Sequence, residues 1–353
     1  MIAAFTSHPL YIEDINNILS IKGINKLAGK SFLITGATGM LGVVLIDALM
    51  VLPDVKIYAV GRCKEKAFNR LQHHFSNPDF VFIQQDVTTP FDADLVVDYI
   101  IPLASNTHPL GYSRYPIETM LINLKGAKYA LDLATVCGAT VIYPSSVEIY
   151  GDTVSDKGFD EGSNGALNLS TSRACYTESK RSCEALCQSY AAEKGTKVKI
   201  IRLSRIFGST MLKDDTKASS QFIQNALACE NIVLKSKGMQ YFSYVYVADA
   251  IAGLLYVLLY GENARAYNVS SEKANICLKD FAGICADFVG SKVVFNIPNE
   301  EEKKGYSVVK NAILDNSLIK SIGYTPIYSI DEAINRTIKI LKGLYQNELT
   351  CFV

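Results

Sequence analysis

The sequence predicts an α/β fold: a doubly wound parallel sheet of the Rossmann type, followed by a smaller mixed C-terminal substrate domain. Short, continuously apolar segments alternate with segments of helical length, which is typical of parallel strands covered by helices on both faces. In addition, Gly36, Gly39 and Gly42 stand three apart, between the first apolar segment and the next. Together these features indicate repeated strand–helix–strand units with right-handed crossovers.

The individual elements follow from the same pattern. Residues 1–28 are expected to form a helical lead-in, because Ile12, Ile15, Ile18 and Leu19 recur at helical spacing. The strands predicted for the main sheet are 31–35, 55–60, 80–86, 95–105, 140–146 and 197–204, with 264–271 returning to it as the last strand. The helices predicted between them are 40–52, 119–138 and 174–195.

The alternation becomes irregular from about residue 205, where polar loops appear, and this change marks the predicted domain boundary. A chain of 353 residues also exceeds the usual size of one compact core. The predicted dinucleotide-binding domain comprises residues 29–204 and about 240–271, and the predicted substrate domain comprises about 205–239 and 272–353.

Composition and charge exclude several classes of function. Hydrophobic residues make up 49% of the chain and charged residues 20%, as in ordinary soluble globular enzymes. Lys+Arg and Asp+Glu balance at 35 each, so neither nucleic acid nor a membrane surface is expected as a partner. The N-terminus lacks the pattern of a signal peptide, and the longest apolar stretch, 250–261, is too short to span a bilayer and is predicted to be a buried helix. The nine cysteines lack metal-ligand spacing, so we expect reduced thiols, no metal and a cytoplasmic location.

The glycine turn "GATGMLG" predicts a dinucleotide site, the alternative being a plain strand-to-helix turn. Gly36 allows the tight turn, and Gly39 lets the backbone approach a pyrophosphate. Gly42 lets the following helix pack closely on the strand, with its N-terminal amides directed at the anion. The other candidate cofactor contacts in this turn are Thr38, Met40 and Leu41.

The ends of the second and third strands bear on the identity of the dinucleotide. A site for NAD usually has an acid at the end of the second strand, which binds the ribose 2′-hydroxyl. This chain has Arg62 instead, and a cation suits a 2′-phosphate, so we expect NAD or NADP with NADP favoured. The alternative is that Arg62 stacks on adenine or faces solvent. Asp86, which ends the third strand, is expected to accept a hydrogen bond from the adenine amino group.

Three residues form a candidate catalytic group. Tyr176 and Lys180 lie four apart in a helical segment and therefore share one face. An ammonium beside a phenol lowers the pKa of the phenol, and a phenolate can take a hydroxyl proton while hydride leaves the same carbon. Ser146 stands at the C-terminal end of a strand, where open α/β sheets place their sites. We expect it to hydrogen-bond the substrate oxygen and Tyr176.

In this order, the glycine turn, the strand-end serine and the Tyr/Lys helix resemble the extended short-chain dehydrogenase/reductase family, which includes nucleotide-sugar epimerases, dehydratases and decarboxylases. The resemblance covers roughly residues 29–345. The matching stretches are "GATGMLG", "DV" at 86, "PLAS" at 102–105, "NLKGA" from Asn123, "SSVEIYGD", "RACYTESKR", "RLSRIFG", "YVYVADA" and "AYNVSS". The resemblance implies a nicotinamide cofactor, a nucleotide-sugar substrate, and catalytic roles for Ser146, Tyr176 and Lys180.

Further roles are also implied by the resemblance. The additional cofactor contacts are Val87, Leu103, Ala104, Ser105 and Asn123, besides Tyr176 and Lys180. Relatives commonly dimerise by a four-helix contact that includes the Tyr/Lys helix. We therefore expect a homodimer, with the cysteine- and alanine-bearing face of "SCEALCQSYAA" in the contact.

Glu148 narrows the expected reaction. Several 4,6-dehydratases and the UDP-glucuronate decarboxylases have Glu two places after the catalytic Ser/Thr, where epimerases typically have a small or hydroxyl residue. A carboxylate there suits chemistry at C5, whose proton is acidified once C4 is a ketone. We expect transient oxidation at C4 followed by dehydration or decarboxylation, unless Glu148 is only a solvated loop residue or a helix cap. The alternatives are epimerisation, a net NADP-dependent reductase or dehydrogenase, and a non-catalytic dinucleotide-binding sensor.

The candidate substrate contacts are Ser105, Arg173, Arg205, Tyr241 and Lys310. Relatives hold the substrate's diphosphate or carboxylate with arginines, one of which is missing near residues 308–314. Arg205 and Lys310 are either substitute phosphate contacts or ordinary surface residues. The aromatic run that contains Tyr241 and Phe242 is expected to be a strand, with one of these rings flanking a base such as uracil.

The histidines are not expected to bind a metal. His73 and His74 lie in a polar helical segment and are expected to be solvated. His108 follows the fourth strand, in a loop that is expected to border the site.

Overall fold

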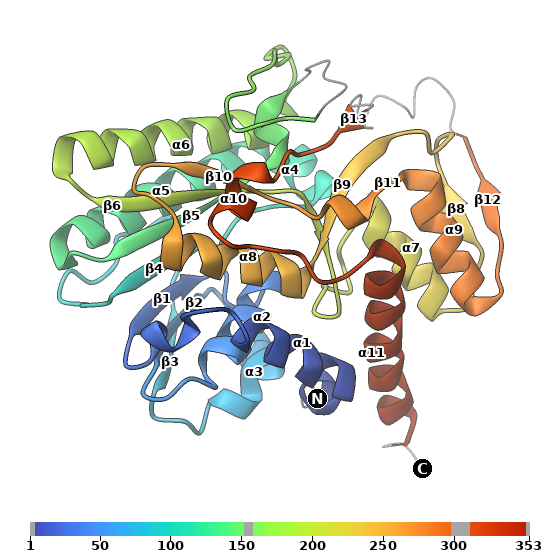
Figure 1. Ribbon diagram of the computed structural model, residues 1–353, viewed down its shortest axis with the longest axis horizontal. Helices are drawn as coiled ribbons and strands as arrows, with labels where there is room; N and C mark the ends of the chain where they lie inside the picture. Colours follow the sequence, from blue (N-terminus) through green and yellow to red (C-terminus); the bar gives the residue numbers. More distant parts are fainter. Residues whose placement is uncertain (1–3, 152–157, 298–310, 351–353) are drawn as a thin grey trace.

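A seven-stranded parallel sheet forms the centre of the computed structural model, which describes residues 4–151, 158–297 and 311–350, with side chains as far as residue 343 (Figure 1). The strand order is β10-β6-β5-β4-β1-β2-β3. The strands are β1 Ser31–Thr35, β2 Lys56–Gly61, β3 Phe80–Gln84, β4 Tyr99–Pro102, β5 Thr140–Ser146, β6 Lys197–Leu203 and β10 Ala266–Val269. The chain runs outward from β1 to β3 and then returns across β1 to β4, which is the reversal of a doubly wound sheet. The predicted fold class and the return of the last strand are confirmed.

Helices cover both faces of this sheet. The helices α5 (Pro116–Cys137) and α6 (Ala174–Lys194) pack together on one face, and α2 (Met40–Leu49) and α8 (Val247–Tyr260) pack together on the other. Alternate residues of β1 supply the two cores: Leu33 packs on the α5–α6 side, and Phe32 and Ile34 pack on the α2–α8 side. Burial on both faces is why the strands are continuously apolar.

The apolar stretch at 250–261 lies in α8 as far as Tyr260, and most of it is buried, as predicted. Among the described helices, none combines the length and apolar character required to cross a bilayer. The eight cysteines within the described residues all carry free thiols.

A second group of elements packs at the carboxyl end of the main sheet. Its central strand, β9 (Tyr241–Tyr246), pairs with β7 (Arg205–Phe207), β11 (Asn275–Cys277) and β13 (Asn311–Ala312). The other elements of this group are α7 Ala218–Leu227, β8 Ile232–Leu234, α9 Leu278–Val289, β12 Val293–Phe295 and α11 Ile330–Thr350. Outside it, α3 Lys64–Leu71 packs on β3, α4 Pro109–Arg114 packs on α5, and α10 Ser317–Ser321 packs on β10 and α8. Thus β9 joins this second group while α8 and β10, which follow it, join the main sheet. The proposed domain boundaries remain a prediction.

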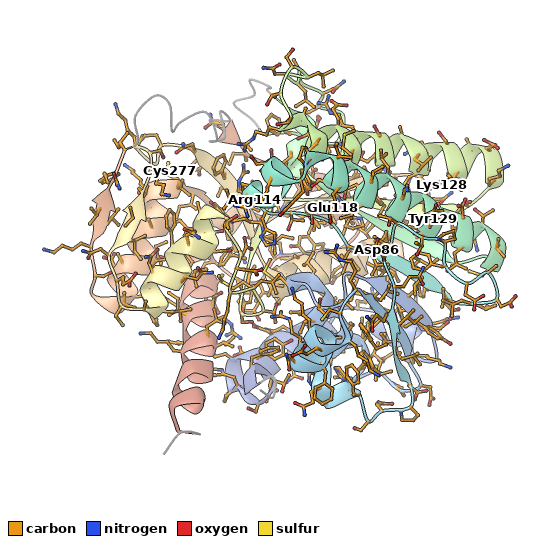
Figure 2. The ribbon with its side chains drawn as sticks, turned by 180° about the vertical axis from the view of Figure 1, so that it is seen from behind. Asp86, Arg114, Glu118, Lys128, Tyr129 and Cys277 are labelled. Atoms are coloured by element: carbon orange, nitrogen blue, oxygen red, sulfur yellow. The ribbon has the colours of Figure 1, made fainter. Side chains whose placement is uncertain are left out.

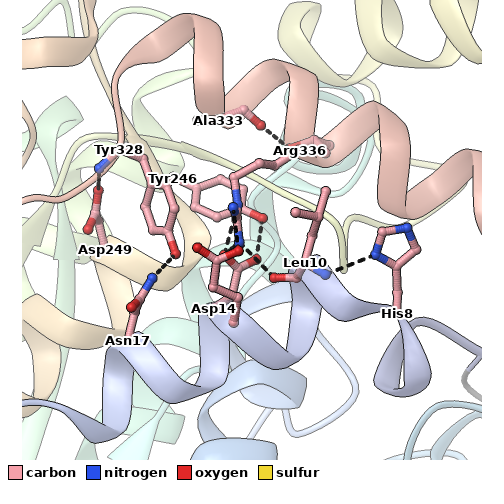
Figure 3. Close-up of polar contacts among 11 residues, drawn as sticks. His8, Leu10, Asp14, Asn17, Tyr246, Asp249, Tyr328, Ala333 and Arg336 are labelled. Carbon is pink, nitrogen blue, oxygen red and sulfur yellow. Dashed lines mark hydrogen bonds and ion pairs between the residues drawn. The ribbon is translucent and has the colours of Figure 1, made fainter.

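The helical lead-in contains α1 (Pro9–Leu19), in which Ile15 and Ile18 are buried while Ile12 is 45% exposed. This helix is fastened on two sides. Tyr11 donates a hydrogen bond to the Asp47 carboxylate of α2, and the Asp14 carboxylate is bound by an arginine of α11 (Figure 3). The segment therefore links the first helix of the main sheet to the last helix of the chain.

The prediction that His73 and His74 are solvated is wrong in one respect. Their Nε2 atoms lie 2.8 and 2.7 Å from Oδ1 of the buried Asp47, although His73 stays partly exposed. These three side chains are of metal-ligating types, but they are joined by hydrogen-bond distances, and the partly buried guanidinium of Arg70 is close enough to interact with the same carboxylate. We interpret the cluster as structural, because a cation would add charge beside Arg70.

The helix face expected at a dimer contact also needs correction. Cys183 and Cys187 of α6 are fully buried against the sheet and α5, so they do not lie on an outward face. The exposed side chains of this stretch are small and polar, and include Ser182, Ala185 and Ser189.

Candidate active site

The glycine turn joins β1 to α2 at the carboxyl edge of the sheet. Gly36 has a φ of 63°, and a Cβ atom there would lie 2.8 Å from the Ala104 backbone nitrogen. A Cβ atom at Gly42 would lie 2.6 Å from the Gly36 carbonyl oxygen. The helix α2 begins directly after Gly39, so its first amides face the turn. Glycine at these two positions therefore lets the loop after β4 and the first turn of α2 pack closely on the turn, an arrangement that fits a dinucleotide.

The candidate contacts at the end of β4 are tied to the helices above the sheet. Ser105 Oγ donates to Asn123 Oδ1 at 2.7 Å, and Asn123 Nδ2 donates to Ser179 Oγ at 2.8 Å. Leu103 and Ala104 form the backbone that approaches Gly36. This chain of hydrogen bonds connects the loop after β4 to α5 and to the Tyr/Lys helix α6.

The third group of candidate cofactor contacts lies at the ends of β2 and β3. Asp86 accepts hydrogen bonds from the backbone and hydroxyl of Thr88, each at 2.8 Å, and these bonds lower its pKa. It lines an open cavity of about 580 Å³ together with Glu118 and other residues of α5, on the face shown in Figure 2. Arg62 is largely exposed, and its guanidinium pairs with Glu118 at 3.4 Å. Val87 is buried against α5.

The three candidate catalytic residues are brought together by β5 and α6. Ser146 is the last residue of β5, and its side chain lies near enough to Tyr176, in the first turn of α6, to lower the pKa of that phenol. Lys180 lies one turn later, buried, with Nζ donating to the Pro144 carbonyl oxygen at 2.8 Å. Its Nζ is 6.0 Å from the centre of the Tyr176 ring. The sheet edge and the helix therefore place an alcohol, a phenol and an amine together.

The electrostatics of the phenol differ from the expectation. Burial raises the pKa of Tyr176, and the Ser146 hydrogen bond offsets only part of that shift. Burial also lowers the pKa of Lys180 from 10.5 to about 8, so its positive charge is lost within a pH unit or so above neutral. The predicted lowering of the phenol pKa is therefore absent from the protein alone, because burial acts on both partners.

Glu148 and Arg205 lie next to this group. Glu148, in the single turn after β5, is near enough to Tyr176 to raise the pKa of that phenol further, and Arg205 Nη2 pairs with Glu148 Oε1 at 3.4 Å. The Arg205 guanidinium lies over the Phe242 ring, with its Cζ atom 3.6 Å from the ring centre. A carboxylate, a stacked guanidinium and a phenol therefore face one region.

Sequence reasoning missed one residue of this region. Tyr112 of α4 stacks on the Tyr176 ring at 5.5 Å, and burial raises the pKa of Tyr112 to about 12. Arg173 lies over the Tyr112 ring, with its Cζ atom 5.9 Å from the ring centre. The only feature of the sequence that points to Tyr112 is its position after β4, in the same segment as His108. His108 itself contacts Asp215 at 3.2 Å.

Of the remaining candidate substrate contacts, only Tyr241 lies within the described residues. Tyr241 is 40% exposed, and its hydroxyl donates to the Asn275 carbonyl oxygen at 3.3 Å. Lys310 lies outside the described residues.

The fold and the site define a Rossmann-fold protein of the short-chain dehydrogenase type. Residues 32–270 match the NAD dependent epimerase/dehydratase family, and the chain belongs to that family. The predicted resemblance is thereby confirmed.

Individual relatives point in the same direction. The chain is 28% identical over 323 residues to UDP-glucuronic acid decarboxylase 1 of Danio rerio, covering 90% of this chain and 74% of the relative. It is 31% identical to UDP-glucuronic acid decarboxylase 6 of Arabidopsis thaliana over 239 residues, 68% of each chain. Its fold is similar to that of a dTDP-glucose 4,6-dehydratase of Streptomyces venezuelae with NAD and TYD bound, at a TM-score of 0.76 and 21% identity, covering 91% of this chain and 98% of the other.

Proposed function

We propose that this protein is a nicotinamide-dependent enzyme that modifies a nucleotide-activated sugar, by transient oxidation at C4 followed by decarboxylation or dehydration. The observation that carries the proposal is the meeting of Ser146, Tyr176 and Lys180 beside the glycine turn, with Glu148 next to the phenol. The relatives are named as enzymes of this kind.

The residues of the turn and of the adjoining strand ends would hold the cofactor. These are Gly36, Thr38, Gly39, Met40, Leu41, Gly42, Asp86, Val87, Leu103, Ala104, Ser105 and Asn123. Once bound, NAD or NADP would accept a hydride from C4 and return it in the same cycle. Arg62 supports NADP as the predicted preference, although its ion pair with Glu118 competes with a 2′-phosphate.

The chain's own residues handle the protons. Ser146 positions the substrate C4 oxygen, and Tyr176 takes the C4 hydroxyl proton. Lys180 has a pKa of about 8 and therefore gains or loses its positive charge close to neutral pH. In its charged form it stabilises the phenolate.

Glu148 serves the second half of the reaction. In dehydration it takes the C5 proton, and the C6 hydroxyl leaves as water after gaining a proton. In decarboxylation the C5–C6 bond breaks, CO₂ departs, the bonding electron pair moves into the C4 carbonyl, and C5 then takes a proton. Epimerisation would use the same Ser–Tyr–Lys group but would leave Glu148 without a chemical role.

We also infer a homodimer through α5 and α6, and we retain the prediction of a cytoplasmic location. The apolar side chains of α5 that remain exposed in the single chain include Ile117 at 75% and Val136 at 69%, which supports a partner on this face. The mass in solution, measured by light scattering, tests the dimer.

The test of the proposed function is product analysis. UDP-glucuronate, dTDP-glucose, GDP-mannose and UDP-glucose are each incubated with the protein and either NAD or NADP, and the products are separated by chromatography. We expect one substrate to be decarboxylated or dehydrated without net consumption of cofactor. Release of reduced cofactor would favour a net dehydrogenase, and no turnover of any sugar nucleotide would count against the enzyme.

A further inference from the structure

The ammonium of Lys180 lies near two tyrosine rings, of which only one belongs to the candidate catalytic group. Its Nζ atom is 5.1 Å from the centre of the Tyr143 ring and 6.0 Å from the centre of the Tyr176 ring. Tyr143 lies on β5, the strand that ends at Ser146, and it is 2% exposed. The strand that supplies the serine therefore also brings a second aromatic ring to the amine.

The other surroundings of this amine do little to favour its charged form. Nζ donates a hydrogen bond to the Pro144 carbonyl oxygen at 2.8 Å, while burial lowers the pKa of Lys180. The small cavity beside the amine is lined by Tyr143 and by residues without titratable groups, including Thr35 and Asn123. The titratable groups that α6 places near the amine are Tyr176, Cys183, Glu184 and Cys187.

None of these four groups of α6 supplies an uncompensated negative charge. Burial raises the pKa of both thiols and of the Tyr176 phenol, so all three are neutral near pH 7. The Glu184 carboxylate is paired with the Arg202 guanidinium of β6 at 2.8 Å. Burial also holds the pKa of Tyr143 well above its ordinary value, so this side chain presents an uncharged aromatic ring, whose face attracts a cation.

We propose that Tyr143 is a positioning residue of the active site, whose ring holds the Lys180 ammonium in its charged form beside Tyr176. This role rests on the proposed function, in which the charged amine stabilises the phenolate. The attraction between a cation and an aromatic face is strongest where water is excluded, and both side chains are buried. Because Tyr143 is itself buried, it acts through Lys180 and not on the substrate.

The ring of Tyr143, and not its hydroxyl, carries this role. The hydroxyl oxygen is buried and has no hydrogen-bond partner among the described residues, and such a group is unfavourable. A phenylalanine at this position should therefore keep the effect on the amine, with equal or greater stability. A leucine fills much of the space without an aromatic face, so it should lose the effect.

NMR measures the charge of Lys180 without any substrate. In protein labelled with carbon-13 at the lysine Cε atoms, the Lys180 signal is the one that Lys180→Met lacks, and its chemical shift is followed from about pH 6 to 11. We expect Tyr143→Leu to lower the titration midpoint by about 0.5–1.5 pH units and Tyr143→Phe to leave it unchanged. The matched control is Phe32→Leu, which removes a buried ring from β1 on the other face of the sheet and should keep the parent midpoint.

The pH profile of turnover tests the consequence for catalysis. Turnover should decline on the alkaline side as Lys180 loses its charge. In Tyr143→Leu this decline should move to lower pH by the same amount as the NMR midpoint, with little change in KM. Tyr143→Phe and Phe32→Leu should keep the parent profile. A merely structural role would lower turnover at every pH without moving the profile.

The outcomes separate this role from the proposed function. An unchanged or raised midpoint in Tyr143→Leu, or a lowered one in Tyr143→Phe, overturns the effect of the ring on the amine and leaves the proposed function standing. A lowered midpoint with an unmoved pH profile overturns the positioning role alone. A lowered midpoint with no turnover of any sugar nucleotide by the parent protein overturns the proposed function, and the positioning role with it. If Tyr143→Leu fails to fold, Tyr143→Met decides, because the same lowered midpoint is required of it.

Discussion

The buried Arg336 and the half-buried Arg205 are used in opposite ways. Arg336, on α11, donates hydrogen bonds from Nε and Nη2 to Asp14 at 3.1 and 2.7 Å, and from Nη2 to the Leu10 carbonyl oxygen (Figure 3). Its Nη1 atom donates to Glu13. Every nitrogen of its guanidinium therefore has a partner. Arg205 has one partner for Nη2, at the longer distance of 3.4 Å, and none among the described residues for Nη1.

The difference distinguishes a structural contact from a candidate binding site. The structural contact, between Arg336 of α11 and Asp14 of α1, is called the joint below. A saturated arginine has nothing left to bind, so Arg336 fixes α1 against α11 and serves the architecture. Arg205 has a donor without a partner, beside a carboxylate and a phenol. This arrangement is unfavourable in the protein without a ligand, and a ligand that accepts from the donor can relieve it. Changes at the joint should therefore alter stability with little direct effect on chemistry, and changes at the site should do the reverse.

The largest effect is expected from Tyr176→Phe, which removes only the hydroxyl that faces Ser146. Turnover should fall by about 10²- to 10⁴-fold, because proton transfer by a positioned side chain contributes about this much. The unfolding midpoint should stay the same or rise slightly. Product chromatography and thermal unfolding together measure both. A variant with near-normal turnover would remove Tyr176 from the chemistry.

At the joint, Arg336→Met should lower the free energy of unfolding by about 3–5 kcal/mol, because it leaves the buried Asp14 without its cation. The double change Asp14→Asn with Arg336→Met should be less damaging than the single one. Urea unfolding midpoints of the three proteins measure this order. If Arg336→Met were as stable as the parent, the joint would not be a structural element.

Glu148→Gln tests whether the site charge acts in the second half of the reaction. We expect product formation to fall by about 10²-fold, while oxidation at C4 persists and the 4-keto sugar accumulates. Rapid quenching followed by mass spectrometry detects that species. Unchanged product formation would make Glu148 merely the ion-pair partner of Arg205 and would favour epimerisation.

The sequence predicted the parts of this molecule that depend on repeating local patterns. The strand predicted at 55–60 is observed as Lys56–Gly61, and the helix predicted at 174–195 as Ala174–Lys194. The segment 95–105 was predicted too long, because only Tyr99–Pro102 pairs with a neighbouring strand. The pattern of apolar residues in the sequence shows which residues can be buried, but it does not show at which residue a strand begins to pair with its neighbour.

Contacts between distant segments could not be predicted in this way. The bonds of His73 and His74 to Asp47 join residues 26 and 27 positions apart, and Tyr112 reaches Tyr176 from another helix. The pKa of Tyr176 was given the wrong direction because the Tyr/Lys spacing shows proximity but not burial. Side-chain orientation and desolvation arise only once the sheet and helices are assembled.

Lys180 offers a smaller, pH-dependent test of the site. Its pKa is about 8 in the folded protein against 10.5 ordinarily, so between these pH values the unfolded chain binds more protons than the folded one. Stability of the parent relative to Lys180→Met should therefore rise with pH over this window, by at most about 1.4 kcal/mol per pH unit. Urea midpoints of both proteins from pH 7 to 10 give the difference. Parallel curves would mean that folding does not lower the pKa of Lys180.

The smallest effect is expected at Arg62, because its guanidinium is exposed and already paired with Glu118. Arg62→Ala should weaken NADP by about tenfold or less and leave NAD unchanged, since only the 2′-phosphate needs the cation. Glu118→Gln should shift the balance the other way, by releasing Arg62 from its ion pair. Fluorescence titration of both dinucleotides on the three proteins measures the ratio. If that ratio is the same in all three, Arg62 faces solvent and the predicted preference for NADP is wrong, whereas the glycine turn would still bind the pyrophosphate that the two dinucleotides share.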